Sequence, residues 1–333
     1  MKQVSVNATQ CRNTGLILKK KSIRPSFYER EFLSFKADRE TKLRLYLFSA
    51  AICHQTYSLA NPGLNLYGWD FLEYGFLQMI KNHSFLFENL NRVDCSAKNI
   101  QEHLAVTFSE NGDAKNCTLD NLEERSEMLE EICNVAITDF DGTISALLEQ
   151  SEGKLYNSGR GVYEVLGRFK GFNDPLKKKI TFFLKLATDA AVFNVADPEN
   201  IIPIMDYHMQ RVLMRLGCVE INDKRLYTDL INRNPAGSDK PVREACIEAI
   251  KIIADISEHG IFKMNDFFWP LGRSCCNENP LCVSNTCEKT PCTFFTVVDL
   301  KSHESCIFEK ICKGSTDEYY RKLWQPVVET NFY

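Results

Sequence analysis

The chain has 333 residues, of which 44% are hydrophobic and 25% are charged, a composition typical of a soluble globular protein. No run reaches the ~18 apolar residues of a membrane span, and the N-terminal stretch lacks the apolar core of a secretion signal, so we expect a cytoplasmic protein. The net charge of −4 argues against a surface coated with basic groups for nucleic acid, although a local basic patch remains compatible with it.

Residues 1–40 are polar and basic, with a lysine triplet at 19–21. We expect a partly ordered basic arm, which either contacts phosphates or is simply solvated. Residues 41–270 are rich in helix-forming patterns and are predicted to form one helical body. Residues 271–333 are predicted to form a cysteine-rich loop and a C-terminal tail.

A buried helix is predicted from residue 41 and ends near His54-Gln55-Thr56, before the helix-breaking Asn61-Pro62-Gly63. Gly68-Trp69-Asp70 then opens an aromatic-rich helix. Aromatic side chains can hold a base that has left the DNA stack, although they more often simply fill a core. Residues 107–130 carry many acids and amides and are predicted to be a solvated linker and helix.

Residues 133–143 are an apolar run that leads into Asp139-Phe140-Asp141-Gly142-Thr143. This resembles the nucleophile loop of haloacid-dehalogenase-type phosphatases, in which one aspartate attacks phosphorus. The rest of that fold requires alternating strands and helices, whereas the residues after 144 have helical patterns. The phosphatase is therefore a minor alternative.

Residues 160–188 predict two helices joined by a turn that contains Gly171 and Pro175. Lys177, Lys178 and Lys179 follow the turn at the start of the second helix. A lysine triplet on a helix is usually solvated charge, and the alternative is a lysine nucleophile.

Residues 201–217 begin with an apolar run and continue as a helix that Asp206 is expected to cap. Val212, Leu213 and Leu216 have the spacing of a buried face, and Gly217 is a helix stop. By its position alone, Asp206 is an ordinary capping residue.

Seven of the fourteen cysteines lie between residues 275 and 312. In a reducing compartment this density favours metal or cluster ligation over disulfides.

The pattern Asp-x-His-x-x-Arg-Val-x-x-Arg from Asp206 resembles the segment that carries the catalytic aspartate of the helix-hairpin-helix DNA glycosylases, the endonuclease III superfamily. The helix pair at 160–188 resembles the family's hairpin, and residues 49–56 resemble the helix with which its adenine-glycosylase branch wedges DNA. These parts occur in the family's order over residues 41–312. The resemblance implies an all-α, two-lobed fold with a C-terminal cluster loop.

The resemblance also implies the site. Asp206 would stabilise the positive charge that develops on the sugar as the base leaves, and Lys179 is the best candidate for the lysine that attacks the sugar in strand-cutting branches. Further residues are implied to contact the substrate or the DNA; they are His54, Gln55, Trp69, Asp70, Gly171, Lys178, His208 and Arg211.

The cysteine region resembles the family's iron–sulfur loop in two pieces, Gly272–Cys282 and Cys306–Cys312, which here are separated by a longer insertion. The implied ligands of a [4Fe–4S] cluster are Cys276 (or Cys275), Cys282, Cys306 and Cys312. A rival set ends with Cys287 and Cys292. Four thiolates also suit Zn²⁺, which is the alternative cofactor.

We therefore expect a monomeric DNA glycosylase that removes a damaged or modified base, including hypermodified bases such as those of phage DNA. The segments Asp-Pro-Leu-Lys-Lys-Lys and Asp-Tyr-His are also similar to the queuosine-salvage nucleotide hydrolases, for which the substrate would be a free modified nucleotide. An interpretation of another class is a non-catalytic nucleic-acid-binding scaffold. The sequence does not identify the base.

Overall fold

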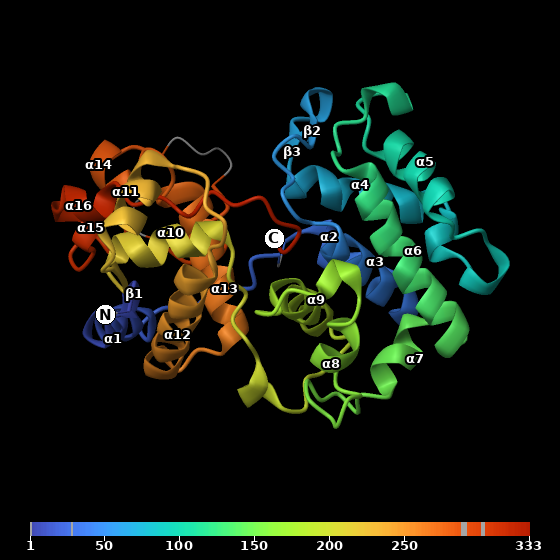
Figure 1. The fold of residues 1–333 in the computed structure, drawn as a ribbon, viewed down its shortest axis with the longest axis horizontal. Coiled ribbons are helices and arrows are strands. Elements are labelled where there is room, and N and C mark those ends of the chain that lie inside the picture. The colour runs from blue at the N-terminus through green and yellow to red at the C-terminus, as the bar shows by residue number, and fades with distance from the viewer. Residues whose placement is uncertain (1, 28, 288–291, 301–303) are drawn as a thin grey trace. The chain divides into compact units, whose positions relative to one another are not determined.

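The computed structural model describes residues 2–27, 29–287, 292–300 and 304–333. Within these residues the chain is mainly helical, with 54% helix and 4% strand, which confirms the predicted all-α class. None of the helices in these ranges is long and apolar enough to cross a membrane. The chain divides into two compact units (Figure 1): unit 1 comprises Met1–Glu29 and Ile202–Glu329, and unit 2 comprises Arg30–Ile201 and Thr330–Tyr333.

Unit 1 combines the N-terminal segment with the cysteine-rich third of the chain. Its elements are β1 (Val4–Val6), α1 (Ala8–Leu18), α10 (Tyr207–Leu216), β4 (Val219–Ile221), α11 (Lys224–Asn232), α12 (Lys240–Ser257), α13 (Ile261–Pro270), the π-helical turn η7 (Leu271–Cys275), α14 (Leu281–Ser284), α15 (Lys313–Thr316) and α16 (Glu318–Arg321).

The N-terminal segment is an integral part of unit 1 rather than the partly ordered arm that we expected. β1 pairs antiparallel with β4, so that Val4 lies opposite Ile221. α1 lies against α12 (Figure 1), and its buried positions Cys11, Thr14, Gly15 and Leu18 have the i, i+3, i+4, i+7 spacing of one helix face. A threonine and a glycine on that face explain why the segment looked solvated from its composition.

Unit 2 consists mainly of helices connected by loops and 3₁₀ turns. Its elements are α2 (Glu31–Ser34), α3 (Arg39–Ala51), β2 (Ala60–Asn61), β3 (Leu66–Tyr67), α4 (Trp69–Lys81), α5 (Ala97–Thr107), α6 (Leu122–Asp139), α7 (Ile144–Glu149), α8 (Val162–Leu166), α9 (Lys178–Asp189) and the 3₁₀ turns η1 (Pro62–Leu64), η2 (Phe85–Phe87), η3 (Leu90–Arg92), η4 (Ala114–Asn116), η5 (Lys170–Phe172) and η6 (Pro198–Asn200).

α3 is the centre of unit 2, because every residue from Leu43 to Ala51 is buried. α9 packs against α3, and α5 packs against α6. The C-terminal end of α3 therefore meets the first turn of α9, where the lysine triplet lies. This contact places the predicted residues His54 and Lys179 next to each other.

The phosphatase alternative is wrong in its local structure. Residues 133–139 form the last turns of α6 and not the strand that such a nucleophile loop follows. Asp141 lies in the turn after the helix, with a left-handed backbone at φ 51°.

Candidate functional site

Asp206 occupies the N-cap position of α10, as expected. Its backbone is extended, and its carboxylate accepts a hydrogen bond of 2.9 Å from the backbone N–H of Met209. The side chain is held in a sheltered position, since Asp206 is only 7% exposed. A carboxylate at a helix N-terminus also benefits from the helix dipole. The structure thus accounts for Asp206 as a cap whose carboxylate is buried at the start of α10.

The first turn of α10 is pressed against the turn that begins the cysteine region. A Cβ added to Gly272 would lie 2.7 Å from the carbonyl oxygen of His208, so only glycine fits at this contact. The His208 ring lies against the ring of Tyr207, with centroids 4.2 Å apart, and its Nδ1 is 3.0 Å from the Arg211 guanidinium.

Two arginines of α10 hold the cysteine loop. Arg211 donates hydrogen bonds of 2.8 Å to the carbonyl oxygens of Cys276 and Gly272. Arg215 donates to the carbonyl oxygen of Asn277 at 2.7 Å and lies 3.8 Å from the Cys276 sulfur. Both arginines are buried. The predicted DNA contact Arg211 therefore has a structural partner in the loop, and its contact with DNA remains a prediction.

The side chains of both arginines lie against the indole ring of Trp324. The guanidinium carbons of Arg211, Arg215 and Arg233 lie 4.5, 5.5 and 4.1 Å from the Trp324 ring centroid. Burial, and then the neighbouring Arg215, lower the pKa of Arg211 to about 10. Sequence reasoning missed Trp324, since no motif marks it.

Trp324 also lines a basic pocket of about 460 Å³ in unit 1. Arg215, Arg233, Arg321 and Lys322 contribute positive charge to its wall. The lining also contains Glu278, which pairs with Arg233 at 2.6 Å. This is the local basic patch that the overall charge of −4 left room for.

Four cysteines of the predicted ligand set influence one another electrostatically. Burial, followed by the charges of Cys276 and Cys282, raises the pKa of the Cys312 thiol to about 12. The pKa of Cys306 is raised by burial and by Cys276, Cys312 and Cys282. Such mutual effects require proximity, so these four sulfurs gather in one region.

Cys275 has a different partner. Its thiol shares a hydrogen bond with Cys292, which raises the pKa of Cys275 and lowers that of Cys292. Cys306 and Cys287 also act on Cys275. Of the two adjacent cysteines that the sequence could not separate, Cys276 is the one that acts on all three of Cys282, Cys306 and Cys312.

The donor chemistry fits a four-thiolate cofactor in kind, because cysteine sulfur binds both iron–sulfur clusters and Zn²⁺. In the described ranges, no group of three or more His, Cys, Asp and Glu side chains has the spacing to hold a single metal ion. No disulfide joins cysteines within the same ranges. The cofactor remains a prediction.

Lys179 lies in the first turn of α9 with its side chain directed into the core of unit 2. Its Nζ donates to the carbonyl oxygen of Ala51 at 2.6 Å and lies 3.1 Å from Nδ1 of His54. The residue is only 1% exposed. Burial lowers the pKa of Lys179 to about 7, and the charges of Lys178 and Arg125 lower it as well, while Cys53 opposes them. A buried amine that is half neutral near pH 7 has the chemistry of a nucleophile.

His54 is the neutral partner of this amine. It is 1% exposed, and burial, followed by the charges of Lys179 and Arg125, keeps its pKa far below the ordinary value. Arg125 is also completely buried and donates to the carbonyl oxygens of Ile52 and His54 and to Asp120. We call Lys179, His54, Arg125, Lys178 and Cys53 the lysine centre.

Sequence reasoning missed two members of the lysine centre, Arg125 and Cys53. Residues 107–130 were expected to be a solvated linker and helix because they are acidic. The spacing of Arg125, Met128, Leu129 and Ile132, all buried on α6, would have indicated an inward face.

The turn before α9 is closed by an acid. The Asp174 carboxylate accepts hydrogen bonds of 3.0 Å from the backbone N–H groups of Leu176 and Lys178. Gly171 is buried in η5, where an added Cβ would lie 3.4 Å from that of Ala51. The predicted helix–turn–helix layout is present. The backbone N–H of Lys178, which a DNA phosphate would need as a donor, is already hydrogen-bonded to Asp174.

Trp69 and Asp70 lie at the start of α4. Arg30 pairs with Asp70 and with Glu73, each at 2.8 Å, and the Trp69 indole N–H donates to Glu73 at 3.0 Å. The Trp69 ring meets the Phe182 ring edge-on, at 5.1 Å between centroids. Lys178 Nζ lies 5.6 Å from the same Phe182 ring, and 3.7 Å from the sulfur of Cys53. Trp69 thus adjoins the lysine centre.

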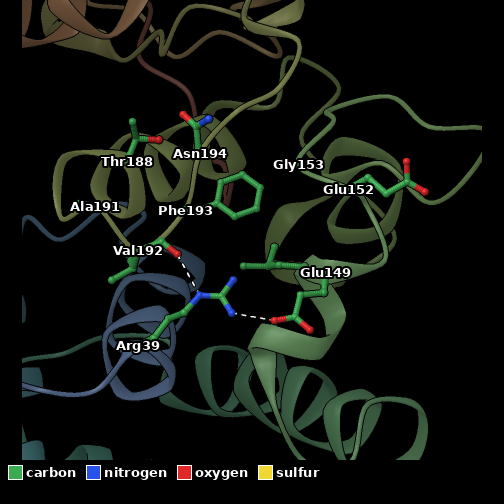
Figure 2. Close-up of a pocket in the computed structure, with 10 residues that line it drawn as sticks. Arg39, Glu149, Glu152, Gly153, Thr188, Ala191, Val192, Phe193 and Asn194 are labelled. Carbon is green, nitrogen blue, oxygen red and sulfur yellow. Dashed lines mark hydrogen bonds and ion pairs between the residues drawn. The ribbon is translucent and has the colours of Figure 1, made fainter.

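A separate pocket of about 630 Å³ in unit 2 lies around Arg39 (Figure 2). Arg39 donates to the carbonyl oxygen of Val192 at 3.1 Å and to Glu149 at 2.7 Å, and Figure 2 shows the Phe193 ring beside the guanidinium. The Thr188 hydroxyl is buried, with no hydrogen-bond partner among the residues that the structure describes. The described residues of its lining include none of the predicted site residues.

No family model matches the chain, and no curated protein matches it in sequence. The resemblance to the helix-hairpin-helix glycosylases therefore rests on the motifs and on their order in the chain.

Proposed function

We propose that the protein is an N-glycosylase that hydrolyses the N-glycosidic bond of a damaged or modified base in DNA. The observation that carries the proposal is the association of two motifs in unit 1. The helix that Asp206 caps is also the helix whose Arg211 and Arg215 hold the cysteine loop. The Asp206 motif and the cysteine motif are each weak alone. Their direct contact supports the interpretation that they form one functional unit.

Asp206 would act on the sugar. As the base leaves and takes up a proton, positive charge develops on the sugar ring, and a buried carboxylate stabilises that charge. Water then adds to the anomeric carbon and gives up a proton. The sheltered position of Asp206 strengthens this interaction because little water screens it.

Lys179 would add a second activity. A neutral amine can attack the anomeric carbon in place of water and form a Schiff base as the sugar ring opens. Its pKa of about 7 supports this role, because about half of the amine is neutral at pH 7.

Cys276, Cys282, Cys306 and Cys312 would hold a [4Fe–4S] cluster, with Zn²⁺ as the alternative. Its role would be structural, since hydrolysis transfers no electrons. It would connect residues near 276 to residues near 312 and so brace the loop on which α10 rests.

The experiment that tests the proposal is Asp206→Asn, with mass spectrometry of bases released from duplexes that carry different modified bases. Asparagine caps helices as well as aspartate does, so the fold is retained. We expect base release to fall by at least ~100-fold while DNA binding persists. Asp223→Asn is the matched control, because Asp223 caps α11 in the same unit. Release at the rate of the unmodified protein would remove Asp206 from the mechanism.

A second candidate is a hydrolase of free modified nucleotides, and the acidic net charge of −4 favours it. The basic pocket at Trp324 suits phosphate in either case. Including free modified nucleotides among the substrates of the same assay separates the two candidates. Release from duplex DNA that weakens steeply with salt supports the glycosylase.

A further inference from the structure

The last residues of the chain return to unit 2. Residues 202–329 belong to unit 1, whereas Thr330–Tyr333 belong to unit 2. The carbonyl oxygen of Tyr333 accepts a hydrogen bond of 3.3 Å from the backbone N–H of Gln55. Asn331 donates through its side-chain amide to Glu124 at 3.2 Å, and Tyr333 is only 5% exposed. This segment is thus fixed at two points, one beside His54 and one on α6.

Both residues that hold the segment, Gln55 and Glu124, lie next to members of the lysine centre. Glu124, which Asn331 holds, places its other carboxylate oxygen 3.8 Å from Nε2 of His54. Glu124 also acts electrostatically on Lys179. Gln55, which Tyr333 holds, directly follows His54 and has a left-handed backbone at φ 41°. A continuous path therefore runs from Asn331 through Glu124 and His54 to the Lys179 amine.

We propose that residues 330–333 are a tethered cap on the lysine centre, and that solutes reach the Lys179 amine only after this cap has left. Each hydrogen bond that holds the cap contributes a modest net stability, so the cap opens reversibly. The cap regulates access to the same site in which Lys179 was proposed to act, and this part of the inference rests on the proposed function.

The cap hypothesis is tested without reference to any reaction of the protein. Lysines are labelled by reductive methylation with formaldehyde and cyanoborohydride, and the labelling rate of each lysine is measured by peptide mass spectrometry. In the double variant Asn331→Ala, Tyr333→Ala we expect Lys179 to be labelled about tenfold faster, the effect of one lost hydrogen bond on the opening equilibrium. Tyr67→Ala, which removes an exposed tyrosine of unit 2, is the matched control.

An internal control separates cap opening from unfolding. Lys185 lies in the same helix and is also fully buried. Its labelling should stay slow in the double variant. Unchanged labelling of Lys179, or equal acceleration at Lys185, would overturn the cap.

A synthetic peptide of residues 327–333, added to the double variant, should restore the slow labelling of Lys179. If the peptide leaves the labelling of Lys179 fast even at millimolar concentration, this result counts against the cap. Base release by the double variant separates the two proposals. Faster release supports both the cap and the glycosylase. An absence of release from every substrate, together with accelerated labelling of Lys179, leaves the cap standing and refutes the glycosylase.

Discussion

At the scale of single residues, adjacent lysines of one triplet meet very different environments. Lys177 has a left-handed backbone before the helix, and Lys178 lies beside Cys53 and Phe182. Lys179 alone reaches inward to the carbonyl oxygen of Ala51. Burying an ammonium group is costly, so the amine gives up its proton far more readily than a solvated lysine does.

This difference makes stability depend on pH. The pKa of Lys179 is about 7 in the folded chain and about 10.5 when unfolded, so the folded state binds fewer protons between these values. Stability therefore rises with pH across this window, and the burial cost is complete below pH 7. Relative to Lys179→Met, the unmodified protein should gain up to ~4 kcal/mol between pH 7 and pH 10 in urea unfolding.

The matched control for this prediction is Lys98→Met, which replaces an exposed lysine on α5. Its unfolding free energy should stay parallel to that of the unmodified protein at all pH values. Parallel curves for Lys179→Met as well would mean that the amine is solvated.

Two adjacent cysteines give the sharpest test of the cofactor. Cys276 acts on Cys282, Cys306 and Cys312, whereas Cys275 shares a hydrogen bond with Cys292 and is influenced by Cys306 alone of those three. Protein purified without oxygen should contain about four iron atoms per chain and show a visible absorption that reduction bleaches. Cys276→Ser should lose the iron, and Cys275→Ser should retain it. Equal loss in both variants contradicts the ligand set, and zinc in place of iron supports the alternative cofactor.

The sequence could predict some of these residues and not others. Asp206 as a cap follows from its place before a helical pattern, and the structure confirms it. The choice of Cys276 over Cys275 as a cluster ligand depends on the hydrogen bond between Cys275 and Cys292. No local sequence pattern indicates that these two residues meet. The inward turn of Lys179 depends on the end of α3, which lies 128 residues away in sequence.

At the scale of elements, the helices with a strong local pattern were predictable. α10 begins and ends next to its predicted cap and stop, Asp206 and Gly217, and α9 follows the predicted turn that contains Gly171 and Pro175. α1 was missed because its buried face contains a threonine and a glycine. The pairing of α1 with α12 follows from shape at that face, where a Cβ on Gly15 would lie 2.8 Å from that of Ile256.

This contact gives a prediction for Gly15. Replacing it by valine inserts a branched side chain between two helices that touch, and overpacking of this kind costs ~1–3 kcal/mol. The unfolding free energy of Gly15→Val, measured with urea, should fall by that amount. Gly237→Ala is the control, because an added Cβ there meets no atom within 4 Å. An unchanged unfolding free energy for Gly15→Val would show that α1 does not pack tightly on α12.

At the scale of the whole molecule, both units are assembled from separated stretches of chain. The predicted boundaries at residues 40 and 270 treated the chain as consecutive blocks, whereas unit 1 takes residues from both sides of unit 2. A division of this kind leaves no mark in composition. It arises from long-range pairings such as that of Val4 with Ile221, which local patterns do not encode.

The pairing of β1 with β4 has a consequence for biosynthesis. A ribosome synthesises the chain from the N-terminal side, so β1 and α1 emerge before β4 and α12, which follow about 200 residues later. Most of unit 2 is complete in the meantime. The buried face of α1 therefore stays exposed until α12 has been synthesised. At ~5–20 residues per second this delay lasts on the order of 10–40 seconds, during which a chaperone that binds short apolar helices would find Cys11 and Leu18 uncovered.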